Sequence, residues 1–253
     1  MPLPASTAVR VFLLLATMPE VRRLVKAAIA WWSGKKIAVI GPMAAGKDSF
    51  IARLQQREIP KHHTGSPLRE KVKSFDVKLA LTRTQTIDVT CKGVFNVGGE
   101  PEYRDSPHGW TSVCKGADVI FYVMTVEDLM KKRFLRKGRV RQDLDWLQTV
   151  LPQLDDDVLV HVLVNKVDLE IASHTHYGAL AKELSADLRA LDTTVRRVLH
   201  PYEDRYTGAT LISMKNKSIF TIAMHRAFAA VYAAFHEQEP VAAPNLTPAL
   251  GVT

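Results

Sequence analysis

The sequence predicts an α/β protein with a doubly wound, mostly parallel sheet and helices on both of its faces. Two apolar runs, residues 117–124 (ADVIFYVM) and 158–164 (VLVHVLV), are nearly continuous, which is typical of central parallel strands. A third strand-like segment, residues 35–40 (KKIAVI), leads through a glycine-containing loop into a helical pattern at residues 49–54. Strands that alternate with helices in this way bind ligands at the carboxyl ends of the strands.

The chain of 253 residues is expected to divide into three parts. Residues 1–34 form an N-terminal extension with an amphipathic basic helix, which a capping box at residues 17–20 (TMPE) opens. Residues 35–238 hold the alternating strands and helices, a length that suits a single hydrophobic core. Residues 239–253 contain three prolines and are expected to be disordered.

The other elements follow from local periodicity. Residues 72–81 and 85–97 have the composition of two consecutive strands, the kind that pair antiparallel. The later elements are, in chain order, a helical stretch near residues 144–154, a long polar helix at 176–199, a short strand at 209–212 and an amphipathic helix at 219–235. This alternation is the one that the fold class requires.

Residues 41–48 (GPMAAGKD) lie between a strand and a helix and are typical of a phosphate-binding loop. Gly41 and Gly46 let the backbone wrap closely enough for several N–H groups to point at one phosphate. The helix N-terminus adds roughly half a positive charge at the same place, and Lys47 adds a full charge. The usual pattern continues with a Ser or Thr whose hydroxyl ligates Mg²⁺, but this chain has Asp48. The loop therefore predicts phosphate binding with an altered metal position.

A second motif, residues 165–168 (NKVD), directly follows an apolar run. The Asp168 carboxylate can accept hydrogen bonds from the N1–H and the exocyclic amine of guanine together, a pair of donors that adenine does not offer. Asn165 can bridge the base and the glycine loop, and the stem of Lys166 can cover the ring. Residues 213–215 (SMK) follow the next strand and could present a backbone N–H to the guanine oxygen. These motifs predict GTP or GDP as the ligand.

In this order the motifs resemble those of the Ras-superfamily small GTPases, which are P-loop NTPases, and most closely the Arf/Sar branch. The resemblance rests on residues 44–47 (AAGK), 96–100 (NVGGE), 165–168 (NKVD) and 213–215 (SMK), and it covers about residues 35–236. It implies a guanine-nucleotide switch that hydrolyses GTP to GDP and phosphate with Mg²⁺ as cofactor. It also implies regulatory or effector proteins that bind at the switch regions.

Three positions depart from the family pattern. The resemblance implies a hydroxyl on Mg²⁺ at position 48, an aspartate at 96 and a glutamine at 100, where this chain has Asp48, Asn96 and Glu100. Asp48 could ligate Mg²⁺ directly while Asn96 holds a water, because Mg²⁺ accepts carboxylate oxygen readily. The alternative is weak or metal-poor binding, because a carboxylate beside the phosphates is repelled unless the ion lies between them.

The resemblance assigns catalysis to Lys47, Gly99 and Glu100. An ionised Glu100 could accept a proton from the attacking water, although its charge is disfavoured near the γ-phosphate. Met43 is bulky enough to crowd the side chain that positions the water. Slow intrinsic hydrolysis is therefore expected.

The second expected Mg²⁺ ligand is a switch threonine, assigned here to Thr64, which lies 17 residues after Lys47. The alternatives are Thr82, Thr84 and Thr86. If Thr64 ligates the ion in the GTP-bound state, residues 56–66 should order with GTP and relax with GDP.

A net charge of +8 favours an acidic partner. Residues 1–36 hold six basic side chains against one acidic, and residues 131–141 hold seven basic side chains. Residues 10–32 could bind an anionic membrane surface, pack on the domain or bind a partner. The cluster at 131–141 could equally be a solvated surface, and nucleic-acid binding is not expected because aromatic residues do not interleave with the charges.

The expected location is the cytoplasm, with a peripheral position on a membrane if the N-terminal helix binds one. Two cysteines, Cys91 and Cys114, are too few for a disulfide framework, which favours a reducing compartment. The apolar run at residues 11–16 falls far short of the ~20 residues that span a bilayer, so no membrane-spanning segment is expected.

Two functional hypotheses remain open: a GTP-binding switch with slow hydrolysis, and a non-catalytic GTP/GDP-binding scaffold that recruits a partner or a membrane. The expected catalytic residues are Lys47, Gly99 and Glu100, and the expected metal ligands are Asp48 and Thr64. The expected nucleotide-binding residues are Gly41, Ala44, Ala45, Gly46, Lys47, Asp48, Ser49, Asn165, Lys166, Asp168, Ser213, Met214 and Lys215.

Overall fold

The computed structural model of the chain describes residues 31–32, 34–60, 70–72, 75–80, 86–91, 93–106, 108–171 and 176–238. The expected amphipathic helix, apart from Trp31 and Trp32, lies outside the described residues, and so do Thr64 and the tail at 239–253.

A six-stranded sheet forms the centre of the molecule, with the strand order β2-β5-β1-β6-β7-β8. The five parallel strands are β1 (Lys36–Ile40), β5 (Gly93–Asn96), β6 (Val119–Thr125), β7 (Leu159–Asn165) and β8 (Tyr206–Leu211). The short strand β2 (Glu70–Val72) pairs antiparallel with β5 at one edge. This arrangement confirms the α/β class and the mostly parallel sheet. Strands β2 and β5 lie on one side of β1, and β6, β7 and β8 lie on the other. The strand order therefore reverses at β1, which is where ligands of such sheets bind.

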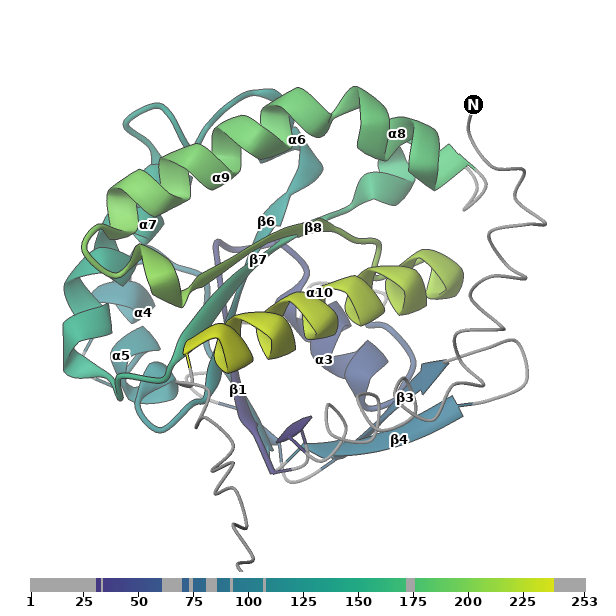
Figure 1. Ribbon diagram of the computed structural model, residues 1–253, viewed down its shortest axis with the longest axis horizontal. Coiled ribbons are helices and arrows are strands. Elements are labelled where there is room, and N and C mark those ends of the chain that lie inside the picture. Colours follow the sequence, from purple (N-terminus) through teal and green to yellow (C-terminus); the bar gives the residue numbers. More distant parts are fainter. Residues whose placement is uncertain are drawn as a thin grey trace, which may run out of the picture.

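Helices cover both faces of this sheet (Figure 1). On one face lie α3 (Lys47–Leu54) and α10 (Lys217–Gln238), and on the other lie α5 (Trp110–Cys114), α7 (Arg139–Val150) and α9 (Ser185–Leu199). Shorter elements connect them: α4 (Pro101–Asp105), α6 (Val126–Met130), α8 (Tyr177–Glu183), η1 (Leu151–Gln153), η2 (Val167–Leu169) and η4 (Glu203–Arg205).

The two hydrophobic cores follow from the alternation of side chains along each strand. In β6, Phe121 and Val123 belong to the core beneath α3 and α10, whereas Ile120 and Tyr122 belong to the core beneath α5, α7 and α9. A strand that is buried on both faces has no polar face, which explains the continuous apolar runs in the sequence.

The expected antiparallel pair is present but lies in a sheet of its own. Strands β3 (Phe75–Ala80) and β4 (Thr86–Cys91) pair antiparallel, while β5 pairs with β1 in the central sheet. The predicted strand at 85–97 is therefore two strands in two sheets. The alternation of Ile87, Val89 and Cys91 stops at Gly93, where the chain changes sheets.

The later elements match their expected positions with changes at their ends. Helix α7 begins five residues before the expected stretch at 144–154, and the long helix expected at 176–199 is two helices, α8 and α9, with Leu184 between them. The short helix α6 was not predicted. The strand expected at 209–212 is β8, and the final helix is α10.

Among the described residues, one helix is long and apolar enough to cross a membrane by length and composition. It is α10, so the expectation of no such segment, drawn from residues 11–16, was too narrow. Its apolar side chains form one of the two cores, together with α3 and the sheet. Because a buried core helix meets the same criterion, the finding is weak evidence for a membrane span.

The end of the N-terminal extension packs against α10. The Trp32 ring stacks on Phe228 with ring centroids 4.0 Å apart, and its Nε1 donates to the Phe228 carbonyl at 3.3 Å. Trp31 contacts Tyr232 and Phe235 edge-on or tilted. The two tryptophans therefore attach the chain before β1 to the folded domain.

Candidate functional site

The glycine loop (residues 41–48) joins β1 to α3, and its two glycines occupy positions that no other residue fits. Gly41 has a φ of 142°, and a Cβ there would lie 2.1 Å from the Val123 carbonyl oxygen. Gly46 has a φ of 102°, and a Cβ there would lie 2.3 Å from Nδ2 of Asn165. The loop thus depends on positive φ values and on close approach to the strands beside it.

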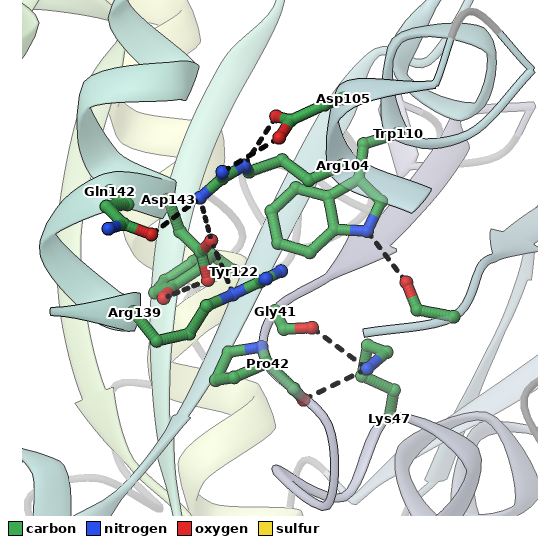
Figure 2. A network of polar contacts seen from close by, with 11 residues as sticks. Gly41, Pro42, Lys47, Arg104, Asp105, Trp110, Tyr122, Arg139, Gln142 and Asp143 are labelled. Carbon is green, nitrogen blue, oxygen red and sulfur yellow. Dashed lines mark hydrogen bonds and ion pairs between the residues drawn. The ribbon is translucent and has the colours of Figure 1, made fainter. Parts of the chain in front are cut away.

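Lys47 is a buried cation that folds back over this loop. Its Nζ donates to the carbonyl oxygens of Gly41 at 2.9 Å and Pro42 at 3.1 Å (Figure 2). Burial lowers the pKa of Lys47 from 10.5 to about 8, and the nearby carboxylates of Asp48 and Glu100 oppose that shift. A desolvated ammonium in a loop of glycines is suited to bind an anion, because few waters have to be removed from it.

Asn165, the last residue of β7, bridges two loops. Its Nδ2 donates to the Ala45 carbonyl at 2.8 Å, and its Oδ1 accepts from the Met214 N–H at 3.1 Å. Only 3% of the residue is exposed. The glycine loop after β1 and the SMK loop (residues 213–215) after β8 are therefore joined through one side chain.

The remaining residues of the NKVD motif are also held in place. Ser213 Oγ donates to Asp168 Oδ1 at 2.6 Å and accepts from the Asn216 N–H at 2.9 Å. Asp168 stays partly exposed, and Lys166 has a left-handed backbone with a φ of 69°. The carboxylate is thus oriented by Ser213 while its outer edge faces the solvent.

Arg53 adds a contact that the sequence did not predict. From α3, its Nε donates to the Met214 carbonyl at 2.6 Å and its Nη2 to the Lys215 carbonyl at 2.7 Å. A basic residue one and a half turns after the glycine loop is the only signal in the sequence. The contact ties α3 to the SMK loop through its carbonyls, whereas Asn165 binds the Met214 N–H.

Gly99 packs directly on the glycine loop. A Cβ on Gly99 would lie 2.4 Å from the Met43 nitrogen and 2.6 Å from Lys47 Nζ. The carbonyl of the preceding Gly98 accepts from Trp110 Nε1 at 2.9 Å, which fixes this segment against α5. Glu100 follows and precedes α4, close enough to influence Lys47. The structure therefore brings the three expected catalytic residues, Lys47, Gly99 and Glu100, to one place.

A buried polar network beside this place was not predicted (Figure 2). The Asp143 side chain of α7 is fully buried and accepts from the Tyr122 hydroxyl at 3.1 Å and from Arg104 Nη1 at 3.3 Å. Arg139, one turn earlier, makes an ion pair from Nε to Asp143 at 2.8 Å. Burial raises the pKa of Asp143 to about 6, against the opposing effects of Arg139, Tyr122 and Arg104. The network connects α4, α7 and β6 next to the glycine loop.

The expected metal ligands are only partly described. Asp48 is half-buried in the first turn of α3, and Asn96 ends β5 beside β1, with Val39 as its partner in the register. Thr64 lies outside the described residues. Within the described part of the chain, no group of three or more His, Cys, Asp or Glu side chains could hold a metal ion. The Asp48 carboxylate has the hard oxygen that Mg²⁺ prefers.

Most of the basic cluster at 131–141 is neutralised within the molecule. Five of its seven cations form ion pairs: Lys131 with Glu127, Lys132 with Asp187, Arg133 with Asp128, Arg139 with Asp143 and Arg141 with Asp145. Arg136 and Lys137 are exposed. The cluster is therefore a weaker attraction for an acidic partner than its sequence indicates.

No model of a known protein family matches the chain, and no curated protein has a similar sequence.

Proposed function

We propose that the chain is a P-loop protein of the Ras-superfamily kind, nearest the Arf/Sar branch, that binds GTP and GDP at the carboxyl ends of β1, β7 and β8. The observation that carries the proposal is the bridge that Asn165 makes from Ala45 to Met214. It joins a loop suited to phosphate with a loop suited to a base, which is the arrangement that a nucleotide needs.

Selection of guanine is assigned to Asp168. Its Oδ1 is held by Ser213, and the carboxylate remains partly exposed, so a planar pair of N–H donors can reach it. Arg53 fixes the carbonyls of Met214 and Lys215, and the Met214 N–H already donates to Asn165. The Lys215 N–H is therefore the donor assigned to the base oxygen.

Slow hydrolysis of GTP is the proposed activity, with Lys47 and Gly99 at the phosphates and Glu100 near the attacking water. The support is their proximity to one another. Asp48, Asn96 and Glu100 replace the residues that hold the metal and the water in the family pattern, so the rate is expected to be low. The same three replacements favour the alternative function, a GTP/GDP-binding scaffold that does not hydrolyse.

Equilibrium binding of GTP, GDP and ATP, each with and without Mg²⁺, tests the proposal. We expect GTP and GDP to bind at least tenfold more tightly than ATP, and Asp168→Ala to remove that preference. Asp157→Ala changes an exposed carboxylate away from the site and is the matched control. Equal binding of ATP and GTP, or no binding of either, would contradict the proposal.

Phosphate release separates the switch from the scaffold. A switch releases phosphate from GTP slowly in the native chain, and Asp48→Ser, Asn96→Asp and Glu100→Gln together should raise the rate sharply. Phosphate release at the buffer rate in both proteins would contradict the hydrolysis hypothesis and favour the non-catalytic scaffold. Loss of GTP affinity on chelation of Mg²⁺ in the native chain, but not in Asp48→Ala, would support direct ligation of the ion by Asp48.

The proposed partners are regulatory or effector proteins at the switch regions, together with an anionic membrane surface at residues 10–32. Vesicles with anionic headgroups should bind the full chain and not a variant without residues 10–30. Binding that survives the deletion would contradict the membrane proposal and the peripheral location. Nucleic acid is not proposed, because ion pairs occupy most of the cluster at 131–141.

A further inference from the structure

Arg139 has a guanidinium group whose two terminal nitrogens lack a partner. Nη1 and Nη2 are both buried, and neither has a hydrogen-bond partner among the described residues. The side chain is 22% exposed as a whole, and this exposure belongs to its carbon atoms, because all three nitrogens are buried. Nε makes an ion pair with Asp143 at 2.8 Å, but like the two terminal nitrogens it has no hydrogen bond of suitable geometry among the described residues.

Burial of these charged N–H donors is unfavourable unless another group accepts hydrogen bonds from them. A guanidinium has five N–H donors and stays charged at every pH that proteins tolerate. Buried charged donors without acceptors are rare in folded proteins, and such a group calls for a missing water, ion or ligand. Arg139 therefore has the unsatisfied donors expected of a side chain that binds a ligand.

The guanidinium points at the phosphate site. Figure 2 shows Arg139 extending from α7 past Asp143 towards Gly41, with Trp110 on its other side. Its Cζ lies 5.4 Å from the centroid of the Trp110 ring. Burial lowers the pKa of Lys47, and the charge of Arg139 adds to that effect, so the two cations are close enough to interact.

Its neighbours hold the group in one orientation. Asp143 engages Nε, and Trp110, which is itself fixed by the Gly98 carbonyl, lies within cation–π distance. The Nη1 and Nη2 edge is left for an acceptor with two oxygens, and a phosphate group matches that fork.

We propose that Arg139, a residue of the chain itself, is a second cation of the phosphate site and binds the terminal phosphate of a bound nucleoside triphosphate. The identity of the nucleotide rests on the proposed function. The presence of an anion site rests only on the buried nitrogens of Arg139. Arg139 would then favour GTP over GDP, because only the triphosphate carries the group that reaches it.

Binding of GTPγS and GDP to Arg139→Gln and Arg139→Lys tests the inference. We expect Arg139→Gln to weaken GTPγS binding roughly tenfold to a hundredfold while GDP binding changes less than about threefold. Arg139→Lys keeps the charge but not the fork, so it should fall between the native chain and Arg139→Gln. Equal loss for both nucleotides, or no loss for either, would overturn the proposal.

Two controls keep a structural effect apart from a binding effect. Arg141→Gln removes a half-buried arginine two residues away that pairs with Asp145 at 2.8 Å, and it should leave both affinities unchanged. The double variant Arg139→Gln, Asp143→Asn removes both charges of the ion pair, so no buried carboxylate loses its partner. It should fold, melt close to the native chain and still lose the preference for the triphosphate; an intact preference in this variant would overturn the proposal.

Inorganic tripolyphosphate and pyrophosphate separate this inference from the proposed function. Should guanine nucleotides fail to bind while tripolyphosphate binds in an Arg139-dependent manner, the arginine site stands and the guanine proposal falls. If guanine nucleotides bind and Arg139→Gln leaves the GTPγS to GDP ratio unchanged, the reverse holds. Absence of binding by every one of these anions would overturn both.

Discussion

Asn165 Nδ2 donates to the Ala45 carbonyl oxygen across 120 positions of sequence, at 2.8 Å, from a residue that is 3% exposed. Its Oδ1 accepts from the Met214 N–H, so this one side chain joins the glycine loop and the SMK loop. Gly46 allows this contact, because any Cβ at that position would overlap Nδ2. The loops at the phosphate end and at the base end of the proposed nucleotide site are thus held together by the hydrogen bonds of Asn165.

We predict that Asn165→Ala lowers both stability and affinity. The change leaves the Ala45 carbonyl and the Met214 N–H buried without this partner, which costs about 1–3 kcal/mol for each such group. We expect the free energy of unfolding to fall by about 2–4 kcal/mol, in urea denaturation, since relaxation recovers part of that cost. GTP, GDP and tripolyphosphate should all bind more weakly, because the glycine loop loses its support.

Gln148→Ala is the control for that variant. Its amide donates to the His200 carbonyl at 3.0 Å on the exposed side of α7, so its removal should cost under about 1 kcal/mol. A similar loss in both variants would show that burial of the Asn165 bridge has no special importance.

Gly99→Ala is expected to disrupt the contact between the Gly99 segment and the glycine loop. The new methyl group would lie 2.4 Å from the Met43 nitrogen and 2.5 Å from the Pro42 carbonyl carbon, and backbone atoms cannot yield as a side chain can. The segment must move away from Lys47, so we expect GTP affinity to fall at least tenfold and GDP affinity to fall less. Isothermal titration with each nucleotide measures both effects.

Gly178→Ala is the matched control for the glycine variant. Gly178 lies near the start of α8, and a Cβ there would meet no atom within 4 Å. Alanine should therefore leave the affinities unchanged and stabilise the protein by up to about 1 kcal/mol through helix propensity. Unchanged GTP affinity in Gly99→Ala would show that the Gly99 segment does not contact the bound phosphates.

Phosphate affinity should fall as the pH rises above about 8, because burial lowers the pKa of Lys47 to about 8 in the free protein. A bound phosphate favours the charged lysine, so binding above that pH must take up a proton. The affinity then decreases by up to about tenfold per pH unit. Tripolyphosphate titrations from pH 7 to pH 10 measure this slope.

The same group acts on stability with the opposite sign. The unfolded chain keeps the usual lysine pKa of 10.5, so between about pH 8 and 10.5 it binds more protons than the folded chain does. The contribution of Lys47 to stability is therefore complete above pH 10.5 and is lost as the pH falls through 8. In Lys47→Met both slopes should disappear, and a surviving decrease of affinity above pH 8 would assign it to another group.

The class of fold could be read from the sequence because burial on both faces leaves a continuous apolar run. Residues 117–124 and 158–164 contain all but the last residue of β6 and of β7 for that reason. The division of residues 85–97 between β4 and β5 was missed, because strand composition alone does not say which neighbour a strand pairs with. The adjacent apolar residues Val94 and Phe95 after an alternating stretch were the available signal.

The proposed base and phosphate residues come together because each follows a parallel strand, and such strands end at one edge of the sheet. Arg139 and Asp143 were missed for a different reason. Arg139 belongs to a run of basic residues, a pattern that is typical of a solvent-exposed surface. Asp143 carried a signal, since it interrupts the apolar stripe of Val140, Leu144 and Leu147 on α7 and so had to be buried with a partner. The assignment of Thr64 stays a prediction, because it lies outside the described residues.

Two tyrosines allow the strength of the Asp143 network to be measured. The Tyr122 hydroxyl donates to a buried carboxylate at 3.1 Å, and the Tyr177 hydroxyl donates to the neutral Leu211 carbonyl at 2.7 Å. Hydrogen bonds to charged groups contribute about 1.5–3 kcal/mol, against about 0.5–1.5 kcal/mol for neutral ones. We therefore expect Tyr122→Phe to lower the free energy of unfolding at pH 8 by more than Tyr177→Phe does, in urea denaturation.

The difference between the two variants should depend on pH. Burial raises the pKa of Asp143 to about 6, so its contribution to stability is complete below pH 3.8 and is lost as the pH rises through 6. Tyr122 opposes that shift by donating to the ionised form, so Tyr122→Phe should raise the Asp143 pKa further and cost more at pH 8 than at pH 5. Tyr177→Phe should cost the same at both values. If the cost of Tyr122→Phe is also independent of pH, Asp143 is not the ionised partner on which the network, and the orientation of Arg139, depend.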